Sequence, residues 1–115
     1  KPLAEMIGEA MEAHRAGDLD LAGTLYAGCL KEAPDHPDLL HLSGLVLHQR
    51  GSHAAALASI DRAIALRQGT PLFLGSRGAV LLALQREAEA LEVLEQAATL
   101  KPDDASNWTR LGLAR

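Results

Sequence analysis

The sequence predicts an all-α fold, a right-handed α-solenoid in which antiparallel helix pairs are stacked one on another. Three observations support this prediction. Equivalent residues recur every 34 positions, apolar residues recur at three- and four-residue steps, and short turn-forming segments separate the apolar runs. A period of this length is typical of stacked helical units, each of which contacts mainly its neighbours and leaves an extended surface for partners.

The 34-residue period appears in columns of small residues and in columns of large ones. The columns are Gly44, Gly78 and Gly112; Ala22, Ala56 and Ala90; Cys29, Ala63 and Ala97; Leu40, Leu74 and Trp108; and Tyr26, Ile60 and Leu94. Glycine inside a helix costs up to about 1 kcal/mol relative to alanine, so helix propensity does not explain its recurrence. We therefore expect Gly44 and Gly78 to receive a neighbouring helix, with the large residues filling the space beside that contact.

The composition favours helices throughout. Hydrophobic residues make up 48% of the 115 residues, whereas aromatic residues make up only 3%. Alanine and leucine, which are strong helix formers, dominate the apolar residues, and segments rich in β-branched residues are rare. Close packing must therefore come mainly from small and aliphatic side chains.

Turn and capping residues place the boundaries of seven predicted helices. Gly17 ends the first helix, Gly51 ends the third, and Ser52 is a suitable N-cap for the fourth. Thr70 and Pro71 begin the fifth, with the proline in the first turn. The predicted helices span residues 3–16, 19–33, 37–50, 53–67, 71–84, 87–100 and 105–115.

Short linkers between these helices determine how they are paired. Connections of a few residues force consecutive helices to lie antiparallel. The sequence therefore predicts three helical hairpins, at 3–36, 37–70 and 71–104, and one unpaired helix. This last helix, at 105–115, either begins a truncated fourth unit or caps the stack.

The residues of this period resemble the tetratricopeptide repeat family over nearly the whole chain. The matching positions are Leu40–Gly44–Gly51–Ala56–Ile60–Ala63, then Leu74–Gly78–Ala90–Leu94–Ala97–Pro102, then Trp108–Leu111–Gly112. The sequence departs from the family pattern at Ala10 and Gln85, where the family usually has glycine, and at Gln68, where it usually has proline.

The resemblance implies a scaffold that binds peptides or other domains along a concave face lined by the first helix of each pair. By this resemblance the inward residues are Ile7, Met11, His14, His41, Leu42, Leu45, His48, Ser76, Ala79 and Leu82. Several of them are apolar, and an exposed apolar surface usually marks an interaction site. We therefore expect a protein or peptide partner in this groove, with an amphipathic helix or an extended segment as its form.

Two specialised versions of the family do not fit these positions. One clamps a C-terminal carboxylate with Lys, Arg and Asn, and the matching positions here carry none of these. The other is the repeat arm of O-linked glycosyltransferases, which has an asparagine ladder. The corresponding residues here are Gly8, Leu42, Ser76 and Arg110. Residues 40–51 nevertheless resemble bacterial repeat regions that often precede a glycosyltransferase domain. A repeat arm of a larger enzyme and a module for self-association, through the groove or the open C-terminal end, therefore remain alternatives.

Catalytic, metal-binding and nucleic-acid-binding functions find little support in the sequence. The net charge is −4 and the basic residues are scattered, so the positive surface expected of nucleic-acid-binding proteins is missing. His41 and His48 stand about 10 Å apart along one predicted helix, too far to share an ion. The serines lack a base arranged beside them, and the acidic pairs lie at helix starts, where capping explains them. We expect a chain that is not an enzyme and that has no metal and no cofactor.

The sequence also carries expectations about location. Cys29 is the single cysteine, which fits a reducing compartment, and we expect a cytoplasmic protein. No apolar stretch reaches the length of about 20 residues that crosses a bilayer, so we expect no membrane association. Cys29 belongs to a column otherwise filled by alanine, which predicts a buried structural side chain rather than a reactive thiol.

Overall fold

The structure is a computed structural model and describes residues 2–100. Within this range the chain forms six α-helices and no strand. They are α1 (Leu3–Arg15), α2 (Leu19–Glu32), α3 (Pro37–Gln49), α4 (His53–Leu66), α5 (Pro71–Ala83) and α6 (Glu87–Leu100). The predicted seventh helix at 105–115, with Trp108, Arg110 and Gly112, and the end of the third predicted unit at 101–104 lie outside the described residues.

The helix starts agree with the sequence-based prediction. Each of the six helices begins at the predicted residue, and five of them end one residue earlier than predicted. Pro37 and Pro71 occupy the first turns of α3 and α5, where the missing N–H has no intrahelical partner to lose. Ser52 and Thr70 precede α4 and α5, but neither side chain makes a capping hydrogen bond. Their position as N-cap residues is confirmed, and their role as side-chain caps is not.

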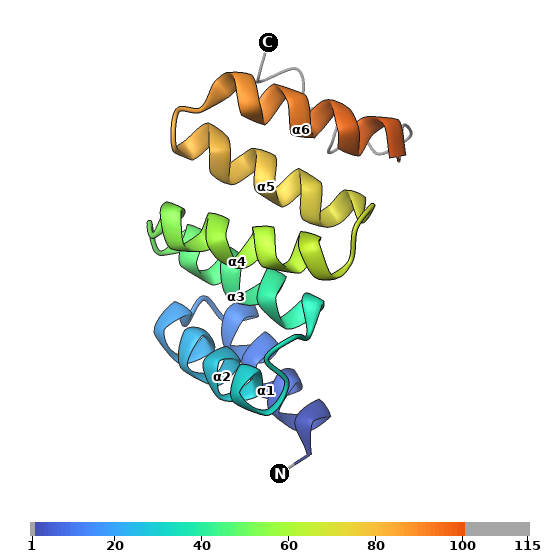
Figure 1. The fold of residues 1–115 in the computed structure, drawn as a ribbon. Coiled ribbons are helices and arrows are strands. Elements are labelled where there is room, and N and C mark those ends of the chain that lie inside the picture. Colours follow the sequence, from blue (N-terminus) through green and yellow to red (C-terminus); the bar gives the residue numbers. More distant parts are fainter. Residues whose placement is uncertain (1, 101–115) are drawn as a thin grey trace.

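The helices follow one another along the long axis of the molecule (Figure 1). Consecutive helices pair as α1 with α2, α3 with α4, and α5 with α6, and these pairs make the most extensive contacts. Neighbouring hairpins meet where α2 contacts α3 and where α4 contacts α5, and α3 also touches α5 directly. The described part of the chain is therefore a stack of three helical hairpins. This arrangement confirms the predicted all-α solenoid.

The columns of the repeat form the core inside each hairpin. Their members on α2, α4 and α6 have no exposed surface, and these are Ala22, Ala56, Ala90, Tyr26, Ile60, Leu94, Cys29, Ala63 and Ala97. A Cβ atom added to Gly44 would lie 2.7 Å from Cγ1 of Ile60, and one added to Gly78 would lie 2.5 Å from Cδ2 of Leu94. The prediction that these glycines receive the neighbouring helix is confirmed. Burial also raises the pKa of the Cys29 thiol, which opposes formation of a reactive thiolate.

A second set of apolar residues joins each hairpin to the one before it. Leu39 and Val46 project from α3 into the core of the first hairpin, and both are almost fully buried. Phe73 and Val80 stand one period later on α5 and insert in the same way into the core of the second hairpin. Each first helix therefore packs against its own partner helix and against the preceding hairpin.

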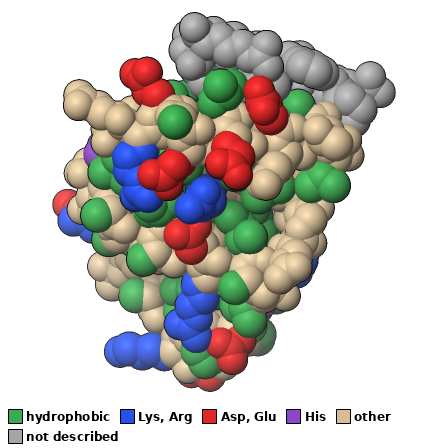
Figure 2. Space-filling view, turned by 45° about the horizontal axis from the view of Figure 1, so that its top comes forward, with side chains coloured by type: hydrophobic (Ala, Val, Ile, Leu, Met, Phe, Trp, Pro, Cys, Tyr) green, Lys and Arg blue, Asp and Glu red, His purple; other side chains and the backbone are tan. Residues whose placement is uncertain are grey.

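The surface carries charges of both signs. Figure 2 shows acidic and basic side chains intermixed on the face that it displays. The guanidinium of Arg77 lies 2.6 Å from Asp61, and that of Arg50 lies 2.9 Å from Asp20. These two ion pairs connect neighbouring hairpins, although exposed pairs of this kind contribute little to stability. None of the helices within residues 2–100 has the length and apolar character that a membrane-spanning helix requires.

Candidate partner-binding surfaces

The ten predicted groove residues come from the first helix of each hairpin. They are Ile7, Met11 and His14 on α1, His41, Leu42, Leu45 and His48 on α3, and Ser76, Ala79 and Leu82 on α5. The structure divides them into two groups. One group is partly exposed, and the other is closed off by contacts between neighbouring helices.

The partly exposed group is mainly apolar. The side chain of Met11 is 40% exposed, and those of Leu42, Leu45, Ala79 and Leu82 are half-buried. Leu42 rests on the core of the first hairpin, and Leu82 rests on the cores formed by α5 and α6. Leu42 and Leu82 are thus held by packing on one side and reach solvent on the other, which suits a preformed apolar binding surface.

His41 on α3 and Ser76 on α5 are buried where these two helices meet. Their exposures are only 3% and 5%, and Nε2 of His41 lies 2.7 Å from Oγ of Ser76. The ring of His41 also packs against Phe73, with the centroids 4.7 Å apart. This burial lowers the pKa of His41, while the nearby carboxylate of Asp38 partly opposes that shift. The expectation that these two side chains line an open groove is therefore corrected, since they hold α3 against α5.

The other two predicted histidines also contact the protein itself. Nε2 of His14 lies 2.6 Å from Oε1 of Gln49, and its Nδ1 lies 3.3 Å from the hydroxyl of Tyr26. Nδ1 of His48 lies 2.8 Å from Nδ1 of His53. Burial and the neighbouring His53 ring both lower the pKa of His48. Across residues 2–100 no three His, Cys, Asp or Glu side chains converge in a way that would hold a metal ion.

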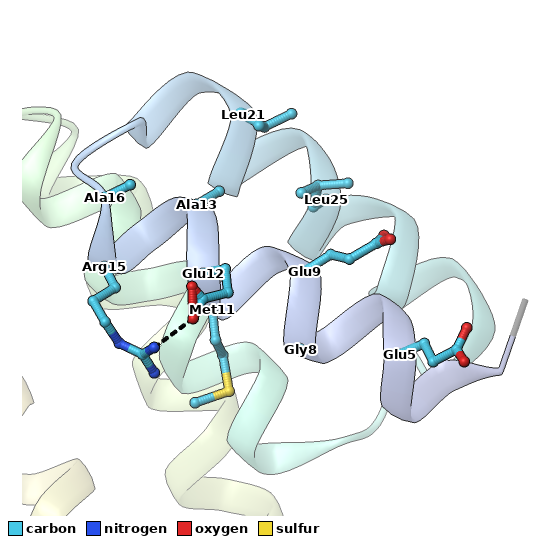
Figure 3. A pocket seen from close by; sticks show the side chains of 10 residues that line it. All are labelled: Glu5, Gly8, Glu9, Met11, Glu12, Ala13, Arg15, Ala16, Leu21 and Leu25. Atoms are coloured by element: carbon cyan, nitrogen blue, oxygen red, sulfur yellow. Dashed lines mark hydrogen bonds and ion pairs between the residues drawn. The ribbon is translucent and has the colours of Figure 1, made fainter.

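A hollow of about 1060 Å³ lies on the outer side of the first hairpin. Figure 3 shows the residues that line it, from α1, from Ala16 directly after α1, and from the first half of α2. The apolar side chains are Met11, Leu21 and Leu25, and the acidic ones are Glu5, Glu9 and Glu12. Met11 is the one predicted groove residue among its lining residues.

The sequence contains a signal for this hollow in the repeat columns of Glu5 and Glu12. Glu5 stands in the same column as Leu39 and Phe73, and Glu12 stands in the same column as Val46 and Val80. The apolar members of these columns are buried between hairpins, whereas both glutamates are exposed. Comparing the columns one by one shows that the outer face of α1 differs chemically from the matching faces of α3 and α5.

Comparison with known families identifies the repeat. A family model described as tetratricopeptide repeat matches residues 7–71 and again 54–105, which together cover most of the chain. The chain belongs to the tetratricopeptide repeat family. A similar curated protein is the inactive TPR repeat-containing thioredoxin TTL3 of Arabidopsis thaliana, which is 32% identical over 80 residues. That alignment covers 70% of this chain but only 12% of the plant protein.

Solved structures of tetratricopeptide repeats have the same fold. The first repeat domain of Spaghetti (RPAP3) bound to an HSP90 peptide superposes with a TM-score of 0.92 at 21% identity, over 97% of this chain and 89% of that one. An O-GlcNAc transferase mutant of Thermobaculum terrenum also has a TM-score of 0.92, at 29% identity, but this chain spans only 22% of it. The Sgt2 repeat domain of Aspergillus fumigatus has a TM-score of 0.91 at 17% identity, over 97% and 76% of the two chains. The low identities of the first and third make them evidence for the fold alone.

Proposed function

We propose that this tetratricopeptide repeat segment is a non-catalytic interaction module that binds a peptide or a segment of a partner protein along its first helices. The observation that carries this proposal is the row of partly exposed apolar side chains on α1, α3 and α5. Met11, Leu45 and Leu82 represent this row on the three successive hairpins. We call it the concave surface.

The contacts around the concave surface support binding without large rearrangement. His14 joins α1 to α3 through Gln49, and His41 joins α3 to α5 through Ser76. These links fix the spacing of the first helices, so the apolar side chains between them are held in place before a partner arrives. Preorganisation of this kind lowers the entropy lost on binding.

A capture experiment tests the proposal with a matched control. The chain and a Leu45→Glu/Leu82→Glu variant are each immobilised and exposed to lysate of the source cell. Leu66→Glu serves as the control, because Leu66 is a 44% exposed leucine on α4, a second helix. Circular dichroism first establishes that all three proteins are folded.

The outcomes of this capture separate the competing interpretations. A partner that is retained by the parent chain and by Leu66→Glu, and lost by the double variant, supports the concave surface. Equal retention by all three proteins would exclude it. Recovery of the same chain alone, in amounts that depend on its concentration, would favour self-association.

A repeat arm of a larger enzyme is the second candidate function. The O-GlcNAc transferase of Thermobaculum terrenum favours it, since this chain matches a fifth of that protein at 29% identity. The asparagine ladder expected of such an arm is absent at Gly8, Leu42 and Ser76, which argues for a different set of partners. Sequencing the complete gene decides this point, because a glycosyltransferase domain in the same chain would establish the arm.

A further inference from the structure

The polar side chains of the concave surface are already hydrogen-bonded within the protein. Four of the ten predicted groove residues are polar, and the other six have apolar side chains. The hydrogen bonds of the polar four join His14 to Gln49 and Tyr26, His41 to Ser76, and His48 to His53. A bound segment therefore meets apolar side chains and polar side chains that have partners of their own.

These internal hydrogen bonds connect helices, so a partner gains little by replacing them. His41 and Ser76 are almost fully buried, and a ligand reaches them only if α3 and α5 separate. His14 connects α1 to α3, and His48 connects α3 to α4 through a distance of 2.8 Å between two Nδ1 atoms. Recruiting any of these side chains to hold a ligand would give up a contact that supports the stack.

An extended segment is poorly suited to such a surface. Every non-proline residue of an extended chain carries a backbone N–H and a backbone C=O, and both need hydrogen-bond partners once a surface covers them. Covering them with apolar side chains leaves them unpaired, which is unfavourable. The concave surface would impose this cost on each residue of the segment that it covers.

An α-helix avoids this cost because it pairs its own backbone groups, except in its first and last turns. Its dimensions also fit. The first helices α3 and α5 touch directly, and helices packed in this way lie about 8–10 Å apart. Positions i and i+7 of a helix lie about 10.5 Å apart, so one apolar stripe on a helix of about 15 residues spans three first helices.

We propose that the concave surface binds its partner protein through an amphipathic α-helix that lies across α1, α3 and α5, with an uncharged apolar stripe on Met11, Leu45 and Leu82. None of the ten predicted groove residues is Asp, Glu, Lys or Arg, so the charged residues of the partner helix lie on its solvent-facing side. This inference rests on the proposed function and adds the secondary structure of the bound segment and the chemistry of its contact face.

Designed peptides of matched composition distinguish the two modes of binding. Each has about 18 residues, long enough for a helix to form, with leucines among glutamine, alanine and equal numbers of lysine and glutamate. In the helical peptide the leucines recur at steps of three and four residues. In the alternating peptide the same leucines occupy every second residue and share one side of an extended chain. A third peptide is the helical one with a central proline, which breaks the helix.

Variants of the protein locate the binding. Leu45→Glu/Leu82→Glu places charge in the middle of the concave surface. Met11→Glu does the same at a side chain that is already 40% exposed, so it perturbs the fold less. Leu66→Glu is the control, because Leu66 is an exposed leucine on α4. Affinity for the 115-residue chain is measured by fluorescence anisotropy, and the ¹³C chemical shifts of the labelled helical peptide report its conformation in the complex.

The expected results depend on both the peptide and the surface. The helical peptide binds the parent chain and Leu66→Glu with similar affinity, and binds Met11→Glu and the double variant at least about tenfold more weakly. The alternating and proline peptides bind the parent chain at least about tenfold more weakly than the helical peptide does. The bound helical peptide has the chemical shifts of an α-helix.

Three results would overturn the proposal. If the alternating peptide binds as tightly as the helical one and loses affinity for the double variant, the helical mode is wrong while the proposed function stands. If a peptide binds all four proteins equally, it does not use the concave surface. If none of the three peptides binds the parent chain, the surface does not recognise an apolar stripe of either form.

The same proteins test two other occupants of the concave surface. Trp108, the single tryptophan, belongs to residues 101–115, outside the described part of the chain. We expect the emission maximum of Trp108 to be the same in the parent chain, the double variant and Leu66→Glu. A shift in the double variant alone would mean that residues 101–115 occupy the surface. Light scattering that finds a dimer of the parent chain, lost in the double variant, would place a second copy there, and either result would overturn the proposal.

Discussion

At the scale of single residues, three helical glycines, Gly8, Gly44 and Gly78, have contrasting surroundings. Gly44 and Gly78 lie against fully buried side chains of the second helices, and Gly78 is the more crowded of the two. Gly8 stands in open space. The same substitution should therefore have opposite effects on the stability of the fold at Gly78 and at Gly8.

Replacing Gly78 with leucine should destabilise the chain. The new side chain would collide with Cγ of Leu94, which lies 2.6 Å from an ideal Cβ position, so α5 and α6 must separate. Overpacking of this kind costs at least about 1–3 kcal/mol of the free energy of unfolding. Urea denaturation of Gly78→Leu measures the loss. Gly8→Leu is the control and should be as stable as the parent chain or more stable, by up to about 1 kcal/mol. An unchanged urea midpoint for Gly78→Leu would show that the helix contact is misplaced.

The buried pair of His41 and Ser76 makes stability depend on pH. The pKa of His41 is lowered from its ordinary value of 6.5 in the folded chain, so the unfolded chain binds more protons just below that pH. Stability is therefore full above about pH 6.5 and declines as the pH falls from there toward the folded pKa. His48, whose pKa is also lowered, adds to the same trend.

The variant His41→Gln should weaken this dependence. Glutamine keeps a hydrogen-bonding group near Ser76 but does not titrate in this range. The urea midpoint of both proteins is measured at several pH values between about pH 5 and about pH 8. This range extends about 1.5 pH units on either side of the ordinary histidine pKa. The parent chain should lose more stability on acidification than the variant. Parallel curves would mean that His41 is not protected from protonation by the fold.

At the scale of elements, the turns between the helices of each hairpin show which residues the fold demands. Gly17 and Gly51 end the first helices of their hairpins with positive φ angles of 85° and 88°. Gln85 occupies the matching turn of the third hairpin and adopts a φ of 62°, a conformation that disfavours side chains with a Cβ atom. The turn therefore keeps the same left-handed backbone conformation although glutamine replaces glycine, and the backbone of Gln85 is strained as a result.

Replacing Gln85 with glycine should stabilise the chain. Relief of the left-handed strain is worth about 0.5–1 kcal/mol after the greater entropy of glycine in the unfolded chain is subtracted. The matched control is Gly51→Gln, which introduces the same residue at the equivalent turn and should destabilise by a similar amount. The urea midpoints of both variants give the answer. A lower urea midpoint for Gln85→Gly would mean that contacts of the Gln85 side chain stabilise the fold by more than the backbone strain at this residue destabilises it.

The sequence predicts the elements well because their boundaries are local. Proline lies in the first turns of α3 and α5, and glycine follows α1 and α3. These residues act through local backbone geometry alone, so the sequence predicts the helix boundaries that they mark. Burial of His41 and Ser76 depends on the distance between α3 and α5, which no local pattern contains. The hollow on the first hairpin was missed for a related reason, since it depends on how Glu5 and Glu12 differ from their buried counterparts.

At the scale of the whole molecule, each hairpin presents two different faces to its surroundings. In the second and third hairpins one face joins the preceding hairpin through residues such as Leu39 and Phe73, and the first helices together form the concave surface. Because stability in such stacks is nearly a sum over neighbours, the inner hairpin, which is packed on both sides, should open less readily than the first. Hydrogen exchange should accordingly be slower for amides in the middle of α3 than for those in the middle of α1. Equal protection of α1 and α3 would mean that the stack opens as one cooperative unit.

We propose that partners bind through the first helices of the hairpins. The most direct measurement is photo-crosslinking, with benzoylphenylalanine placed at position 45 on α3 in one protein and at position 66 on α4 in another. Both side chains reach solvent, so the two probes differ mainly in the surface that they sample. We expect a captured partner to be crosslinked from position 45 and not from position 66. Crosslinking from position 66 alone, or with equal yield from both positions, would contradict it.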